Sequence, residues 1–350
     1  MRYAGWLKKN LFAVVLVAAA LVDPLILRTS FLRHLSIMVL IWATLGTAWN
    51  MLVGYAGQVS LGHGLFFGIG AYTTTLLFVK IGVPPSIGIL AGPILAATVA
   101  YLMGLPLFRL SGFYFSIATI ASAEIGWILF TNWDWAGGAR GLFVPLKGDS
   151  LVHLQFTTKV PYYYLALLLF GLSVYAAHCL ASSRAGYYFR AIRDDPEAAV
   201  SLGINIRKFK AVAYTFSAAI TALAGGFYAN YVLYIDPDSM MAAKFSTQIC
   251  LLTVLGGVGD MWGPLIGASV LIPLSETTRV FLSGRGRAVD LLVYGSLIVA
   301  FAVFQPKGLI GLTRDVLTRA RRAMAPATAA IATVEKPPSA PQDTGQGGMI

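Results

Sequence analysis

The sequence predicts an all-α integral membrane protein, a polytopic bundle of about 8–10 transmembrane helices with glycine-rich interrupted segments. Composition is the first reason: of 350 residues, 57% are hydrophobic and only 12% are charged, and the mean hydropathy is +0.72. A soluble domain carries about 25% charged residues. This chain has too few charges to cover a water-soluble core, whereas a bilayer accepts helices that are apolar all round.

Apolar runs of membrane-spanning length are the second reason. About 20 residues make one crossing, and the stretch between Arg33 and Lys80 contains no Asp, Glu, Lys or Arg, which leaves room for two crossings. A short run at 245–256 is either a crossing or a re-entrant segment, so the number of crossings stays open. The other expected crossings lie at 11–27, 84–106, 113–131, 161–181, 209–234, 262–280 and 288–304.

The distribution of basic residues predicts the orientation of the chain. Lysine and arginine gather near the N-terminus, in the loop 184–210 and near the C-terminus, and such loops stay in the cytoplasm. The net charge of +11 sits in a few loops between apolar runs, so it does not indicate nucleic-acid binding. We expect an N-terminal helix (1–30), a membrane domain (31–320) and a disordered cytoplasmic tail (321–350), which is rich in Ala, Pro, Thr and Gly.

The predicted cytoplasmic loop contains the pattern of a short capped helix. Asp194 or Asp195 can accept hydrogen bonds from the first free N–H groups, and Pro196 suits the first helical position. Glu197 complements the positive end of the helix dipole, and Gly203 can adopt the left-handed conformation that ends a helix. A connecting loop needs no such helix. It either docks into a partner or lies on the lipid headgroups, and the local pattern leaves both open.

Two segments, 54–72 and 256–264, are rich in glycine within apolar surroundings. Backbone at membrane depth leaves the helical path only where it lines a cavity or is buried in protein. Interrupted segments at corresponding places of two halves point to a transport site. Close helix packing through small residues is the alternative, and it is favoured for most of these glycines.

Polar side chains within the apolar runs are the candidate lining of a translocation path. Glu124 is the only acid in the run 113–131. A carboxylate at the centre of a spanning helix costs about 2.5–3.5 kcal/mol, so Glu124 should line a path or join a buried ion pair. His63, as a lone histidine, is more often a hydrogen-bonded structural residue. The candidate path residues are Gln58, Ser60, His63, Tyr72, Glu124 and Gln248.

No enzymatic or metal-binding pattern accompanies these features. No G-x-x-x-x-G-K-[S/T] sequence occurs, so the chain is not expected to bind ATP itself. The two cysteines, Cys179 and Cys250, have neither metal-type nor redox spacing. An ion-coupled secondary transporter would need ionisable residues in several spans, and only Glu124 and His63 qualify, which counts against that class.

Several segments resemble one family of transport proteins. Glu197-Ala198-Ala199, followed after three residues by Gly203, resembles the EAA loop of ABC importer permeases, which seats in a cleft of the ATP-binding subunit. The wider chain resembles the branched-chain amino acid permeases of that class, the LivM type. Gly64 stands where this family more often has alanine. The matching segments are 54–72, 111–119, 190–195, 255–259, 262–264 and 305–309.

The resemblance implies the transmembrane permease subunit of an ABC importer for branched-chain amino acids, in a bacterial inner membrane. The implied partners are a second homologous permease subunit, two ATP-binding subunits and a soluble substrate-binding protein. ATP and Mg²⁺ would bind to the ATP-binding subunits, so this chain would hold no cofactor and would not be an enzyme. Closely similar permeases carry urea and short-chain amides, and the sequence leaves these substrates open. The implied coupling residues are Arg193, Asp194, Asp195, Glu197, Ala198, Ala199 and Gly203.

Overall fold

The computed structural model describes residues 29–110, 112–282, 295–296 and 308–311. Nearly every element within these ranges is a helix, which confirms the predicted all-α class. Seven of the described helices are long and apolar enough to cross a membrane, as expected for a polytopic membrane protein. The crossings expected at 11–27 and 288–304, the N-terminal helix and the C-terminal tail lie outside the described residues.

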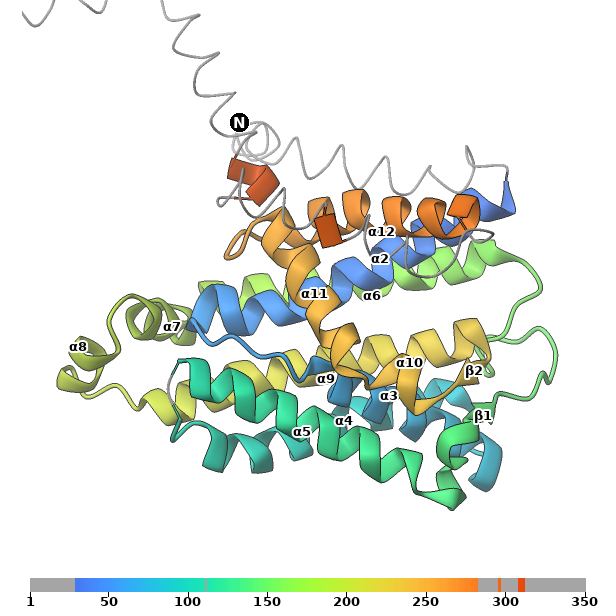
Figure 1. Cartoon of the computed structure of the whole chain (residues 1–350), viewed down its shortest axis with the longest axis horizontal. Coiled ribbons are helices and arrows are strands. Elements are labelled where there is room, and N and C mark those ends of the chain that lie inside the picture. Colours follow the sequence, from blue (N-terminus) through green and yellow to red (C-terminus); the bar gives the residue numbers. More distant parts are fainter. Residues whose placement is uncertain (1–28, 111, 283–294, 297–307, 312–350) are drawn as a thin grey trace, which may run out of the picture. The chain divides into compact units, whose positions relative to one another are not determined.

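The elements follow one another along the chain as Figure 1 colours them. The first half contains α2 (Ser30–Asn50), the π-helical turn η1 (Met51–Tyr55), α3 (His63–Leu76), the π-helical turn η2 (Leu77–Ile81), α4 (Pro85–Leu107), α5 (Phe113–Thr131), the 3₁₀ turns η3 (Asp134–Ala136) and η4 (Gly138–Arg140), β1 (Leu142–Phe143) and α6 (Lys159–Ser182). The second half contains α7 (Arg184–Asp194), α8 (Pro196–Ser201), α9 (Ile206–Val232), β2 (Tyr234–Ile235), α10 (Pro237–Met240), α11 (Ala243–Gly256) and α12 (Gly263–Leu282).

Both glycine-rich segments interrupt their helices, as predicted. The first break, residues 57–62, separates α2 and η1 from α3, so the long uncharged stretch forms two candidate spans. The second break, residues 257–262, separates α11 from α12. The short run at 245–256 lies within the candidate span Pro237–Gly256, which combines α10 and α11.

Glycine allows a close helix contact between α3 and α9. A Cβ at Gly70 would overlap the backbone carbonyl of Ala222, and a Cβ at Gly225 would overlap that of Phe67. The backbones can approach this closely only because these positions have no side chain. The packing reading of the glycine-rich segment 54–72 therefore holds for Gly70. Helix α9 also packs against α4 and α2, and α2 packs against α6 and α12.

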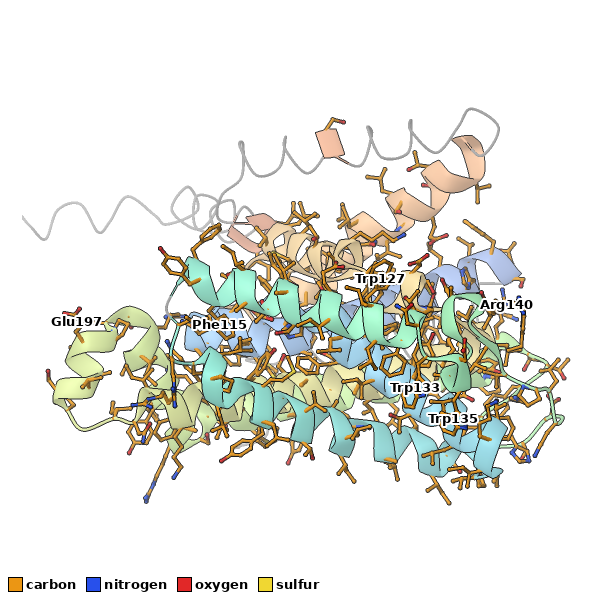
Figure 2. All side chains as sticks on the ribbon, turned by 60° about the horizontal axis from the view of Figure 1, so that its bottom comes forward. Phe115, Trp127, Trp133, Trp135, Arg140 and Glu197 are labelled. Carbon is orange, nitrogen blue, oxygen red and sulfur yellow. The ribbon has the colours of Figure 1, made fainter. Side chains whose placement is uncertain are left out.

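The loop 184–210 and the strand pair occupy opposite ends of the helix bundle (Figure 1). Helices α7 and α8 project at one end. At the other end β1 pairs antiparallel with β2, with Leu142 opposite Ile235. Figure 2 shows the same separation in side chains, because Glu197 lies at the first end and Trp133, Trp135 and Arg140 lie at the second.

Candidate functional site

Helix α8 begins at a cap formed by its own sequence. The side chain of Asp195 accepts hydrogen bonds from the backbone N–H groups of Glu197 and Ala198, each at 3.0 Å. Pro196 takes the first helical position, where its missing N–H costs nothing. Of the two aspartates that could cap this helix, the structure assigns the cap to Asp195. The neighbouring Asp194 instead pairs with Arg193 at 3.2 Å.

Helix α8 ends at Gly203, as the sequence predicts. Gly203 has φ +78°, and its N–H donates to the carbonyl of Val200 at 2.8 Å. The N–H of Ile204 donates to the carbonyl of Ala199 at 3.0 Å. These two bonds form the Schellman motif, which satisfies the last carbonyls of a helix and requires a left-handed residue at this place. No other described atom lies within 4 Å of the position that a Cβ on Gly203 would take, so only the backbone conformation demands glycine.

The outer surface of α8 carries exposed apolar side chains. Leu202 is 79% exposed and Val200 is 59% exposed, while Ala199 is buried beneath the helix. Glu197 and Ala198 are exposed beside them. A protruding helix that keeps apolar residues in the open has the chemistry of an interaction surface. The predicted coupling residues from Asp194 to Gly203 are therefore brought together on one projecting element.

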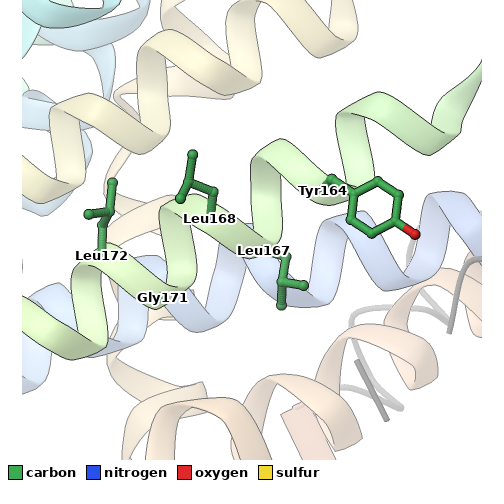
Figure 3. A pocket seen from close by; sticks show the side chains of 5 residues that line it. All are labelled: Tyr164, Leu167, Leu168, Gly171 and Leu172. Carbon is green, nitrogen blue, oxygen red and sulfur yellow. The ribbon is translucent and has the colours of Figure 1, made fainter. Parts of the chain in front are cut away.

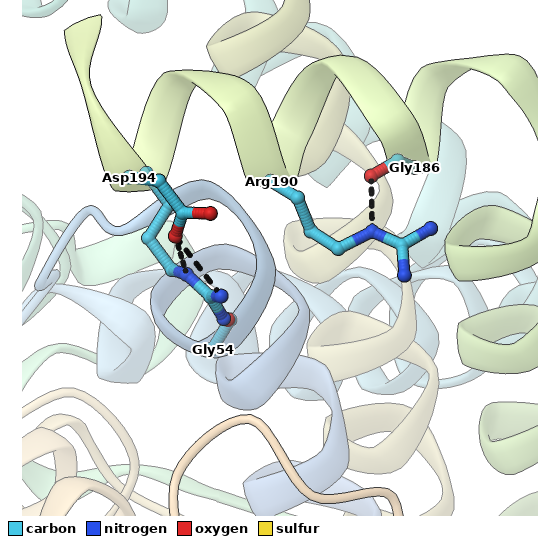
Figure 4. A network of polar contacts seen from close by, with 5 residues as sticks. Gly54, Gly186, Arg190 and Asp194 are labelled. Atoms are coloured by element: carbon cyan, nitrogen blue, oxygen red, sulfur yellow. Dashed lines mark hydrogen bonds and ion pairs between the residues drawn. The ribbon is translucent and has the colours of Figure 1, made fainter. Parts of the chain in front are cut away.

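Arg193 differs from the other predicted coupling residues because it turns toward the bundle. Its Nη1 donates to the backbone carbonyl of Gly54 at 2.8 Å, and its Nε and Nη2 donate to the Asp194 carboxylate at 3.2 Å (Figure 4). Arg190, one turn earlier on α7, bonds only within its own helix in that view: its Nε donates to the Gly186 carbonyl at 3.3 Å. The end of α7 thus contacts the residues that precede the first break.

The predicted path residues Gln58, Ser60 and His63 lie in or directly after the first break, and all three are buried. His63 Nε2 and the Ser217 hydroxyl are 2.7 Å apart, and that hydroxyl donates to the carbonyl of Ala48 at 2.6 Å. His63 therefore joins α3 to α9 and α2, which supports the structural reading of this histidine. The carbonyl of Ser60 accepts a hydrogen bond from the indole N–H of Trp49 at 2.7 Å.

The other three predicted path residues lie on separate helices. Tyr72 is buried on α3 and packs on Phe130 with ring centroids 4.6 Å apart, and its hydroxyl has no hydrogen-bond partner among the described residues. Glu124 on α5 and Gln248 on α11 are both half-buried. The described contacts do not join these three side chains to Gln58, Ser60 or His63.

Sequence reasoning missed the side chains that hold the first break in place. From α5, the Ser116 hydroxyl donates to the carbonyl of Val59 at 2.7 Å, and the Thr119 hydroxyl accepts from the N–H of Leu61 at 3.1 Å. From α11, the Ser246 hydroxyl accepts from the N–H of Gly64 at 2.8 Å. Helices α5 and α11, which carry Glu124 and Gln248, therefore border the break through these hydroxyls. A lone serine or threonine in an apolar helix has no spacing that would reveal such a role.

A shallow apolar groove lies on α6, away from these residues (Figure 3). It has a volume of about 390 Å³ and contains none of the predicted site residues. Its lining residues are Tyr164, Leu167, Leu168, Gly171 and Leu172.

Comparison with known proteins gives consistent relatives. The family described as the permease component of branched-chain amino acid transport systems matches residues 31–302. The permease protein LivM of a high-affinity branched-chain amino acid transport system in Escherichia coli is 30% identical over 334 residues, covering 89% of this chain and 77% of that protein. LivH of Salmonella typhimurium is 24% identical, covering 77% of this chain and 91% of that protein.

A third relative also matches most of the chain. A probable LivM permease protein of Methanocaldococcus jannaschii is 23% identical over 321 residues, covering 78% of this chain and 92% of that protein. No solved structure matches the chain. The family match spans most of the sequence, from the second residue of α2 to twenty residues past the end of α12. The interrupted helices, the capped projecting helix and this match together place the chain in the family of branched-chain amino acid transport permease components.

Proposed function

We propose that this chain is the transmembrane permease subunit of an ABC importer for branched-chain amino acids in a bacterial inner membrane. The relatives are named as permease proteins of high-affinity branched-chain amino acid transport systems, and this chain covers most of their length. In the proposed complex a second homologous permease completes the translocation path. Two ATP-binding subunits bind and hydrolyse Mg-ATP, and a soluble binding protein delivers the substrate.

The single observation that carries this proposal is the construction of α8. Its two ends are fixed by Asp195 and Gly203, within the chain's own loop, and its exposed side presents Val200 and Leu202. A preformed helix loses little conformational entropy when it binds. We assign α8 as the coupling helix, which seats in a cleft of an ATP-binding subunit on the cytoplasmic side. The alternative is that α8 is a connecting helix that lies on the lipid headgroups.

The proposed transport cycle uses differential binding of two ligands. ATP binding draws the ATP-binding subunits together and moves α8, while the loaded binding protein favours the outward-open state, so each ligand stabilises one state of the permease. We place the first break, with Gln58 and Ser60, on the translocation path, together with Tyr72, Glu124 and Gln248. Its support is the departure of residues 57–62 from helical backbone inside the bundle.

The test replaces the left-handed glycine of α8 in the complete importer. Gly203→Val should weaken co-purification of the ATP-binding subunits about tenfold, because β-branched residues resist positive φ by about 1–3 kcal/mol and 1.4 kcal/mol equals one factor of ten. Leucine uptake into proteoliposomes should fall with it. Gly203→Asn should largely restore both, since asparagine tolerates this conformation.

A matched control is available at the other end of the bundle. Gly82 also ends a helical turn at φ +80°, and no other described atom lies within 4 Å of the position of a Cβ there. Gly82→Val imposes the same strain without touching α8 and should leave association and uptake nearly unchanged. If Gly203→Val keeps the ATP-binding subunits and transports normally, α8 is a headgroup connector and the coupling role is wrong. Uptake of urea in place of leucine would overturn the proposed substrate.

A further inference from the structure

Three segments that are distant in the sequence meet beside α8: the end of α2, the end of α7 and the second break. A Cβ built on Gly54 would lie 2.7 Å from the backbone nitrogen of Gly259, so the two backbones are in direct contact. The Nη1 atom of Arg193 lies 3.8 Å from the position of a Cβ on Gly259. The turn η1, which leads directly into the first break, therefore touches the second break at the point where Arg193 enters.

The carbonyl that Arg193 binds is one that the break leaves free of the helical pattern. In a continuous α-helix the Gly54 carbonyl would accept from the N–H of residue 58. Here the N–H of Gln58 donates to the carbonyl of Leu52 at 3.3 Å instead, where the chain leaves η1. A buried carbonyl without a partner costs about 1–3 kcal/mol. The guanidinium of Arg193 supplies that partner at 2.8 Å.

The position of Arg193 is fixed on three sides. The carboxylate of Asp194 holds its Nε and Nη2. Gly57 gives it room, because a Cβ there would lie 2.9 Å from the Arg193 Cγ atom. The cap residue Asp195 follows two positions later and begins α8. A displacement of α8 is therefore transmitted to the guanidinium over a very short length of backbone.

Asn50, the last residue of α2, also bonds the second break. Its amide nitrogen donates to the carbonyl of Asp260 at 2.9 Å, and its amide oxygen accepts from the N–H of Gly259 at 2.8 Å. The Asn50 side chain is only 2% exposed. The Asn50 side-chain amide thus bonds the backbone of the second break through one donor and one acceptor, as a backbone peptide group would.

We propose that Arg193 and Asn50 form a link that passes movement of the coupling helix α8 to both glycine-rich breaks at once. Arg193 is a positioning residue in this link: it binds the Gly54 carbonyl of η1 and packs on Gly57 of the first break, and Asn50 carries the connection on to Gly259 and Asp260 of the second. The inference rests on the proposed function, since it names how α8 acts on the path. It assigns Arg193 to contacts within this chain, in place of contacts with the ATP-binding subunit.

The experiment separates coupling from docking in the complete reconstituted importer. Three quantities are measured: co-purification of the ATP-binding subunits, leucine uptake, and the factor by which loaded binding protein stimulates ATP hydrolysis. Arg193→Gln should keep co-purification at the wild-type level, while the stimulation factor and the uptake fall about fivefold or more, as expected for loss of a coupling energy. Arg193→Lys should recover part of both, because a lysine can still donate one bond to the Gly54 carbonyl.

Arg190→Gln is the matched control. Arg190 lies one turn earlier on the same helix, bonds the Gly186 carbonyl and stacks on Tyr187 at 4.8 Å to the ring centroid, with no contact to either break among its described interactions. This variant removes the same charge from α7 and should leave all three quantities unchanged.

Asn50→Asp provides a second variant that does not depend on the tolerance of Arg193 to change. It keeps the size and the acceptor of Asn50 but removes the donor to Asp260, and it should lower the stimulation factor as Arg193→Gln does. The double variant should be little worse than the more damaging single one, because both changes cut the same link. Normal stimulation in both single variants would overturn the link. Loss of the ATP-binding subunits from Arg193→Gln would also overturn it, since Arg193 would then belong to the docking surface. Neither result would alter the outcome of the Gly203 test.

Discussion

The α3–α9 contact and the end of α8 both depend on glycine, but for opposite physical reasons. At Gly70 the surrounding space is full, since a Cβ would overlap the carbonyl of Ala222. At Gly203 the surrounding space is open among the described residues, and only a φ of +78° excludes other residues. The first glycine stabilises a contact between distant parts of the chain, and the second stabilises a local shape. Substitutions should therefore unfold the protein at one site and change only its associations at the other.

The largest effect is expected from filling the α3–α9 contact. Gly70→Leu forces two helix backbones apart, and we expect a loss of about 3 kcal/mol, the upper end of the usual cost of overpacking. The purified variant should aggregate or unfold at a clearly lower temperature in detergent. Gly171→Leu on α6 is the control, because no described atom lies within 4 Å of a Cβ there. A monodisperse Gly70→Leu protein with the wild-type melting temperature would show that α3 and α9 are not packed as described.

A smaller effect is expected at the buried chain from His63 to Ala48. Ser217→Ala removes the hydroxyl that bonds both groups and leaves the His63 Nε2 without its partner, which costs about 1–3 kcal/mol. Thermal unfolding in detergent measures the loss. Ser269→Ala removes an exposed hydroxyl that bonds only the Leu265 carbonyl of its own helix, and it should change the melting temperature little. Equal melting temperatures for the two variants would contradict the role assigned to Ser217.

The smallest global effect is expected at the start of α8. Asp195→Ala removes an N-cap worth about 1 kcal/mol, and the loss falls on a helix that few other elements support. Backbone amides of residues 197–201 should exchange with deuterium several-fold faster, with no change in α3 or α9. Asp195→Asn keeps a capping oxygen and should exchange nearly as the wild type does. Faster exchange across the whole bundle would mean that α8 is part of the global fold.

The contrast between contacts of distant parts of the chain and local shape also explains which features the sequence could predict. The end at Gly203 was predictable as a single residue and the cap as one of two, Asp194 or Asp195, because each depends on the few residues around it. The first break was predictable only as a glycine-rich interruption. Its geometry depends on hydroxyls from α5 and α11, such as Thr119 and Ser246, and on the wider turn η1. Those features come from tertiary contacts, which local pattern does not encode.

The pairing of β1 with β2 has a consequence for how the end of the bundle opposite α8 can open. It ties the segment after α5 to the segment after α9 by backbone, and the Trp127 indole adds a bond to Asp238 at 2.7 Å. The segment after α5 and the segment after α9 are therefore held together by these hydrogen bonds. If this end of the bundle opens by separating the two segments, these hydrogen bonds must break. If the bonds stay intact, the two segments must move together.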